Sequence, residues 1–178
     1  MYEKKDLYEK AKEEMRISER ILAEIPGFRG YKEKEIRRET DKLIRNHTYR
    51  RLQSARDYLK ETFQRLSDQR LHETLTGMDR LIANFDRVTE KINHASYGYA
   101  GFFNVLKIDE EKLDGVIAFD SGLIDYARKI IEEANTFKKE AIEGHFERVM
   151  EHINNLRESL NELEETFDNR GELILGVK

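Results

Sequence analysis

The amino-acid sequence predicts an all-α protein, an antiparallel bundle of about four to five long helices with coiled-coil-like packing. The composition is 38% charged and 38% hydrophobic with a single proline, which suits amphipathic helices better than sheets. Apolar residues also recur every three to four positions along most of the chain, which is the spacing of one helix face. A chain of 178 residues fits one domain, so we predict a single helical-bundle domain over residues 1–178.

The first helix is predicted from Glu3 to Ile25, where apolar side chains alternate steps of three and four. It ends at a hairpin turn near residues 26–31, because one proline and two glycines prevent its continuation. We favour a structural turn whose aromatic side chains cover the end of the hairpin. The alternative is a recognition loop, whose candidate residues are Phe28, Arg29, Tyr31 and Lys32.

A second helix is predicted from Lys32 to Ser67. Its apolar face shifts by about a quarter turn, so we expect a bend or a change of packing partner between His47 and Arg51. A basic stripe on this helix falls within an arc of roughly 60° and could follow a phosphate backbone. Interleaved acidic residues favour a solvated or internally paired face instead. The basic stripe consists of Arg38, Lys42, Arg45, Tyr49, Arg56 and Lys60.

A third helical stretch is predicted from Leu71 to Ile92, either as a new start after Ser67 or as a continuation. The pattern fails at His94, where a loop rich in glycine and aromatic residues extends over residues 94–108. Four aromatic residues so close together are more often buried than displayed, so we favour a lid over the end of the bundle. The alternative is a partner-binding loop, whose candidate residues are Tyr97, Tyr99, Phe102 and Phe103.

The clearest helix start lies at Asp109, a suitable N-cap that is followed by two glutamates at the positive end of the helix dipole. The apolar pattern continues to Phe137, and Gly144 is predicted to interrupt the helix before a last stripe over residues 146–167. Residues 169–178 lack helical spacing, so we predict a C-terminal tail that folds back onto the bundle. A short strand and a partner-binding tail are the alternatives for this segment.

Two segments of the chain resemble segments of a known protein family. They are PGFRGYKEKEIRR, from Pro26 to Arg38, and SYGYAGFF, from Ser96 to Phe103. They resemble two segments of an uncharacterised family of helical prokaryotic proteins, and the resemblance extends over the helices between and after them. It implies an all-helical fold. Because no activity is established for that family, the resemblance implies no catalytic or binding residue.

No catalytic residue, cofactor or metal site is predicted. The chain has no cysteine, which excludes thiolate metal sites and cysteine nucleophiles. Helical di-metal proteins use Glu-x-x-His pairs, and none of the five histidines has a glutamate three residues before it. His145 and His152 share a helix face, but two histidines on an acidic helix are more often structural than metal ligands.

The net charge of −4 conceals an asymmetry. Residues 1–70 carry 19 Lys and Arg against 14 Asp and Glu, whereas residues 109–178 carry 9 against 18. The two parts can attract one another or bind other molecules. The chain contains no uncharged apolar run long enough for a transmembrane segment and no signal-peptide pattern, so we expect a cytoplasmic protein.

From these observations we predict a non-enzymatic helical protein-interaction or scaffold protein. Long apolar stripes suggest that it forms a homo-oligomer or binds a protein partner. The first alternative is a nucleic-acid-binding protein that uses the basic stripe, a less favoured partner because of the interleaved acidic residues. The second alternative is a ligand- or metal-binding helical bundle.

Overall fold

The all-α prediction is confirmed by the computed structural model, which contains no strand among the residues that it describes. These are residues 12, 15–28, 34–95 and 110–175, with side chains except at 34–38, 110–113 and 174–175. The chain divides into two compact units. Unit 1 comprises Met1–His47, Ser96–Ile124 and Thr166–Lys178, and unit 2 comprises Thr48–Ala95 and Asp125–Glu165. Three helices, at residues 34–68, 110–143 and 149–175, each contribute one part to unit 1 and another to unit 2.

The first described helix spans residues 15–24 and ends where the sequence predicts. Gly27 has a φ of 90°, a conformation that glycine adopts at little cost. Phe28 is 5% exposed and joins Ile21 and Ile25 among the buried residues of unit 1. The helical start predicted near Glu3 lies outside the described residues.

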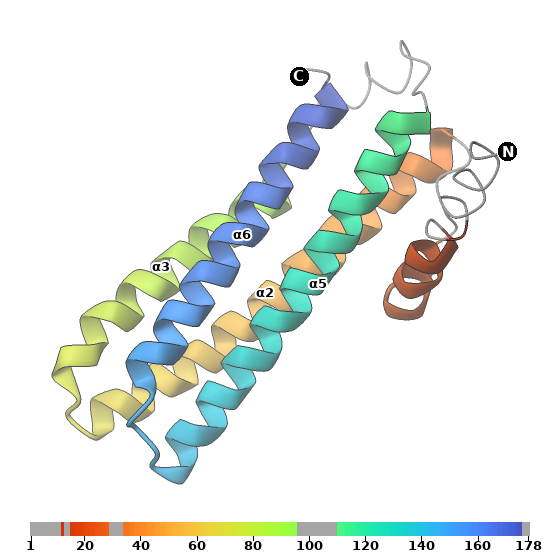
Figure 1. The fold of residues 1–178 in the computed structure, drawn as a ribbon. Coiled ribbons are helices and arrows are strands. Elements are labelled where there is room, and N and C mark those ends of the chain that lie inside the picture. Colours follow the sequence, from red (N-terminus) through yellow and green to blue (C-terminus); the bar gives the residue numbers. More distant parts are fainter. Residues whose placement is uncertain (1–11, 13–14, 29–33, 96–109, 176–178) are drawn as a thin grey trace, which may run out of the picture. The chain divides into compact units, whose positions relative to one another are not determined.

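Helix α2 runs without a break over Lys34–Asp68 (Figure 1). The boundary between the two units falls between His47 and Thr48, within the stretch where the sequence predicts a change of packing partner. Beyond α2, the N–H of Arg70 donates to the Ser67 carbonyl at 2.9 Å, and the N–H of Leu71 donates to the Leu66 carbonyl at 3.1 Å. These two bonds form a Schellman turn that separates α2 from the next helix.

Helix α3 spans His72–His94, close to the predicted stretch, and ends where the apolar pattern fails. Helix α5 spans Glu110–Glu143. Gly144 ends it with a φ of 83°, and the N–H of His145 donates to the Glu140 carbonyl at 2.9 Å. The interruption predicted at Gly144 is therefore confirmed.

Helix α6 spans Val149–Leu175 and differs from the prediction at its end. The sequence predicts a separate tail from residue 169, but the helix continues through this segment. The reason lies in Arg170, which is 1% exposed because acidic side chains within unit 1 bind its guanidinium group. A charged residue thus occupies a buried position of the helix, and an apolar periodicity cannot detect it.

Unit 1 includes close packing between its parts of α5 and α6. A Cβ added at Gly115 would lie 2.7 Å from Cδ2 of Leu173, and one added at Gly122 would lie 3.4 Å from Cγ2 of Thr166. Gly115 and Gly122 are seven residues apart, as are Thr166 and Leu173, so each pair lies on one helix face. The two helices therefore meet along a face on which α5 carries glycines.

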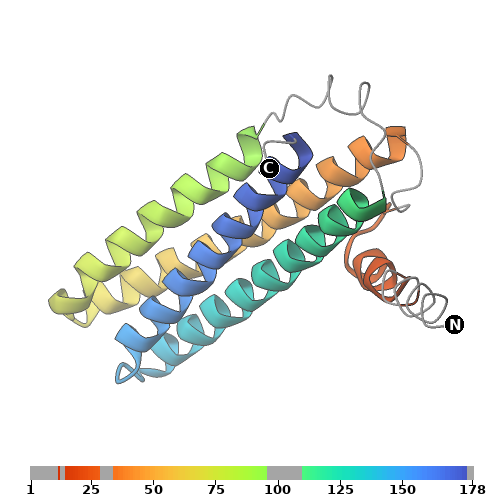
Figure 2. The ribbon, with the colours of Figure 1, turned by 45° about the horizontal axis from the view of Figure 1, so that its top comes forward.

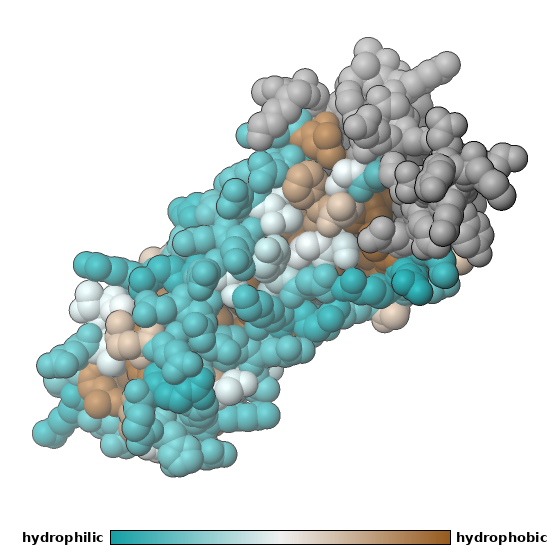
Figure 3. All heavy atoms as spheres, viewed as in Figure 1, coloured by the Kyte–Doolittle hydropathy of each residue, from teal (hydrophilic) through white to brown (hydrophobic). Residues whose placement is uncertain are grey.

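Unit 2 contains four helical segments, which run side by side (Figure 1, Figure 2). Apolar side chains fill its interior, and five that are 0% exposed are Leu52, Leu59, Phe85, Ile130 and Leu156. On the face seen in Figure 3, hydrophilic side chains cover most of this unit. The predicted apolar stripes are therefore buried largely within the chain itself. No helix in the described part of the chain is long and apolar enough to cross a membrane.

Candidate functional site

The two predicted recognition loops lie almost wholly outside the described residues. This applies to Arg29, Tyr31, Lys32, Tyr97, Tyr99, Phe102 and Phe103. Phe28 is described, and its burial supports a structural turn over an exposed recognition loop.

The basic stripe of α2 is divided between the two units. In unit 1, the side chain of Arg38 lies outside the described residues and Lys42 is exposed. Arg45 is engaged by the chain itself, because its Nε donates to Oδ2 of Asp41 at 2.9 Å. One of the two described cations in this part of the stripe is thus paired with a carboxylate.

In unit 2, the stripe continues with Tyr49, Arg56 and Lys60. Nε2 of Gln53 donates to the Tyr49 hydroxyl at 2.6 Å. Arg56 donates through Nε and Nη2 to both carboxylate oxygens of Asp86 in α3, the second at 2.9 Å, and this hydrogen bonding raises the pKa of Arg56. Lys60 is exposed. The pairing of Arg56 supports an internally paired face over a phosphate-binding one.

His152 forms a buried charge cluster in unit 2. Its Nδ1 lies 2.9 Å from Oε1 of Glu133 and its Nε2 lies 2.8 Å from Oε2 of Glu140, while the ring stacks on Phe137. Each ring nitrogen thus lies within hydrogen-bond distance of a carboxylate oxygen, and which of them donates depends on the tautomer. The hydrogen bond from His152, together with the nearby charge of Arg148, lowers the pKa of Glu140.

The histidines do not form a metal site in the described structure. Both ring nitrogens of His152 are occupied by carboxylates, and His145 is exposed with its Nδ1 3.5 Å from Glu143. Across the described residues, no group of three or more His, Asp or Glu side chains is placed to hold a metal ion. The contacts of His152 with Glu133 and Glu140 join α6 to α5 within unit 2.

A second buried charge cluster lies in unit 1 and joins three helices. Nε of Arg170 donates to Oδ1 of Asp120 at 2.5 Å, and its Nη1 lies 2.8 Å from Oδ1 of Asp41. Asp120 is 0% exposed and Asp41 is 4% exposed. Arg45 supplies a second positive charge on Asp41, so two carboxylates face two guanidinium groups. The pairing of these buried charges with one another suits a structural role.

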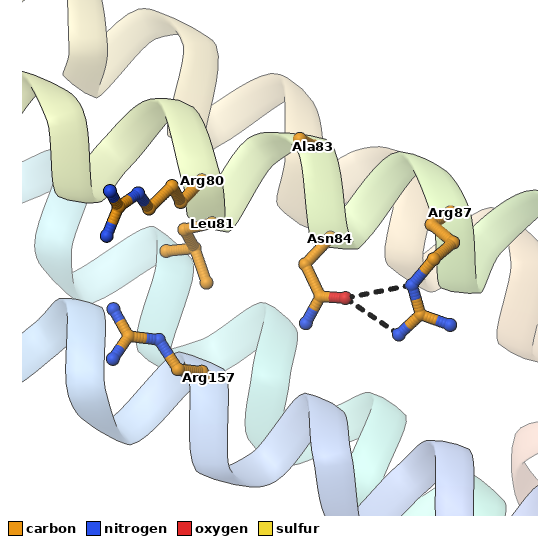
Figure 4. Close-up of a pocket in the computed structure, with 6 residues that line it drawn as sticks. All are labelled: Arg80, Leu81, Ala83, Asn84, Arg87 and Arg157. Carbon is orange, nitrogen blue, oxygen red and sulfur yellow. Dashed lines mark hydrogen bonds between the residues drawn. The ribbon is translucent and has the colours of Figure 1, made fainter.

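A hollow of about 430 Å³ lies between α3 and α6 of unit 2 (Figure 4). We call it the arginine hollow, and it is lined by Arg80, Leu81, Ala83, Asn84, Arg87 and Arg157. In Figure 4, the guanidinium groups of Arg80 and Arg157 lie at one end of the hollow and that of Arg87 at the other. Half of the lining residues are therefore cationic and come from both helices.

The three arginines differ in their partners. Arg87 donates to both carboxylate oxygens of Glu164, at 2.5 and 2.6 Å, and to the amide oxygen of Asn84. In the part of the chain that the structure describes, Arg80 makes no hydrogen bond or ion pair, and Arg157 donates to the amide oxygen of Asn154 at 3.4 Å without a carboxylate partner. Guanidinium groups bind carboxylates and phosphates through two parallel hydrogen bonds. This end of the hollow can therefore bind an anion.

Sequence reasoning missed the arginine hollow, because its residues meet only through the packing of α3 on α6. One signal was present: Arg80 and Arg87 are seven residues apart, as are Arg157 and Glu164, so each pair shares a helix face. Among the three charge clusters described above, the arginine hollow is the one with excess positive charge.

No protein-family model, curated protein or solved structure matches the chain.

Proposed function

We propose that the chain is a non-enzymatic, cytoplasmic protein-interaction protein, and that an acidic group of a protein partner binds in the arginine hollow. The observation that carries this proposal is that Arg80 and Arg157 line one hollow and that neither has a carboxylate partner among the described residues. Like charges that line the same hollow repel one another, and an anion that binds both of them removes the repulsion. The arginine hollow thus has the chemistry of an anion site.

The surroundings of the arginine hollow favour a local acidic group over a nucleic-acid backbone. Asp79 precedes Arg80 and Glu158 follows Arg157 in the sequence, and both acidic side chains are exposed. A duplex or a single strand presents a row of phosphates, which such neighbours would repel. The pairing of Arg45 and Arg56 likewise weakens the basic stripe of α2 as a nucleic-acid surface.

The test compares binding of a fluorescent hexaglutamate peptide with that of a single-stranded RNA by anisotropy at low ionic strength. We expect the wild type to bind the peptide, and the variant R80Q/R157Q to bind it roughly tenfold or more weakly. The matched control is R50Q/K60Q, which removes two exposed positive charges from α2 of the same unit. This control variant should bind the peptide as the wild type does.

Three results would overturn the proposal. The first is the absence of peptide binding to the wild type. The second is equal loss of binding in both double variants, which would indicate a general charge effect. The third is RNA binding that is stronger than peptide binding and that R80Q/R157Q leaves unchanged, which would favour the nucleic-acid alternative. Sedimentation of each variant alone shows whether the partner is a second copy of this chain, because R80Q/R157Q would then reduce the association.

A further inference from the structure

Helices α3 and α6 run parallel within unit 2, in a register that three pairs of residues define. A Cβ at Gly77 would lie 3.5 Å from Ile153, Arg80 and Arg157 line one hollow, and Arg87 binds Glu164. The residue numbers of these pairs rise together along both helices, as expected for two parallel helices. A step of seven residues on α3 therefore corresponds to a step of seven residues on α6, which is two helical turns on each.

We call a set of facing positions on these two helices a layer. One layer of this helix pair contains a carboxylate that is bound by cationic side chains. Glu164 of α6 accepts two parallel hydrogen bonds from Arg87 at 2.5 and 2.6 Å, and a third from Nζ of Lys91 at 2.9 Å. These bonds lower the pKa of Glu164 to about 2, although partial burial opposes the shift. The α3–α6 face thus holds a carboxylate between cations with bidentate geometry.

The layer seven residues earlier repeats the arginine of α3 but not the glutamate of α6. Arg80 takes the position that corresponds to Arg87, and Arg157 stands where the repeat would place a glutamate. This layer therefore combines two positive charges with a hollow (Figure 4), whereas the next layer has the ion pair of Arg87 and Glu164. Like charges at facing positions are unfavourable, so this layer lacks one anion relative to its neighbour.

We infer that the arginine hollow binds the carboxylate of a single Glu or Asp side chain from an acidic segment of the partner. This inference rests on the proposed function. That carboxylate takes the role in this layer that Glu164 takes in the next. It accepts hydrogen bonds from Arg80 and Arg157, one guanidinium from each helix. The ligand class is thus a side-chain carboxylate in an acidic peptide, and the chain itself supplies the template for its recognition.

The experiment places the missing carboxylate within the chain. The variant R157E puts a glutamate opposite Arg80, and R80E puts one opposite Arg157, so each creates the ion pair of the neighbouring layer. Because both arginines are exposed, neither substitution disturbs the core. We expect each variant to melt roughly 1–4 °C above the wild type and to lose hexaglutamate binding. The double variant R80E/R157E places two carboxylates opposite each other, and it should melt below both single variants because like charges repel.

The control for charge alone is R157Q, which removes the repulsion without supplying a carboxylate. A melting temperature of R157E no higher than that of R157Q overturns the inference. The proposed function stands in that case if R80Q/R157Q binds hexaglutamate more weakly than the wild type does. Raised melting temperatures together with no peptide binding to the wild type overturn the proposed function and the inferred ligand with it. A phosphoserine peptide that binds the wild type more than tenfold better than hexaglutamate overturns the choice of a carboxylate.

Discussion

The buried charge cluster of unit 1 yields a quantitative prediction for Arg170→Met. Methionine fills similar space with apolar atoms, but it leaves the carboxylate of Asp120, 0% exposed, without the guanidinium that lies 2.5 Å away. Asp41 is less affected, because Arg45 still faces its Oδ2 at 2.9 Å. The main cost of the substitution therefore arises at Asp120, whose charge has no access to water.

The expected loss is about 3–5 kcal/mol in the free energy of unfolding, the range for removing one partner of a buried ion pair. The variant R170M/D120N tests the cause. Asparagine removes the buried charge but keeps a buried polar group, which costs about 1–3 kcal/mol if its hydrogen bonds are not met. We therefore expect the double variant to regain roughly half of the loss, even though it carries one substitution more.

The assay is urea unfolding at neutral pH, followed by circular dichroism at the helical wavelength. Comparable slopes of the free energy against urea show that the variants unfold from the same folded state. A loss below about 1 kcal/mol in R170M would refute the reasoning, because a buried carboxylate cannot lose its cation at so small a cost. An equal or greater loss in R170M/D120N would show that the guanidinium acts through packing and not through charge.

Two further predictions concern unit 2. Arg70 has a φ of 58° at the position of a Schellman turn that glycine usually occupies, so Arg70→Gly should raise the free energy of unfolding by about 0.5–1 kcal/mol in urea titrations. Glu164 has a pKa lowered to about 2 by Arg87 and Lys91, so its contribution is complete above its ordinary value of 4.5 and is lost as the pH falls towards 2. Glu164→Gln should therefore cost about 1–2 kcal/mol at neutral pH, after allowance for solvent screening, and should reduce the pH dependence over this interval.

Each of these substitutions has a control in the same unit. Arg65→Gly places glycine in the last turn of α2, where it should lower the stability, so a loss in both glycine variants would contradict the argument from φ. Glu165→Gln changes an exposed neighbour of Glu164 and should have little effect. If the wild type and E164Q lost stability in parallel between pH 4.5 and pH 2, the ion pair with Arg87 would not be the source of the acid sensitivity.

The sequence alone determined the helices and most of their limits. Apolar residues every three to four positions predicted α2, α3, α5 and α6, and Gly27 and Gly144 marked two of the ends, because helical periodicity and backbone freedom are properties of the local chain. The prediction of a C-terminal tail was wrong for residues 169–175. From the sequence alone, Arg170 is expected at the surface, because its buried acidic partners are known only from the tertiary structure.

The charged sites were decided only by the tertiary structure. Whether Arg87 meets a glutamate and Arg80 an arginine depends on how α3 and α6 are aligned along their length, and shifting one helix by a turn would change both pairs. Likewise, His152 has two carboxylate partners only because α5 folds back against α6. Helix formation follows from interactions between residues a few positions apart, whereas the pairing of charges depends on distances of a few ångströms between residues far apart in the sequence.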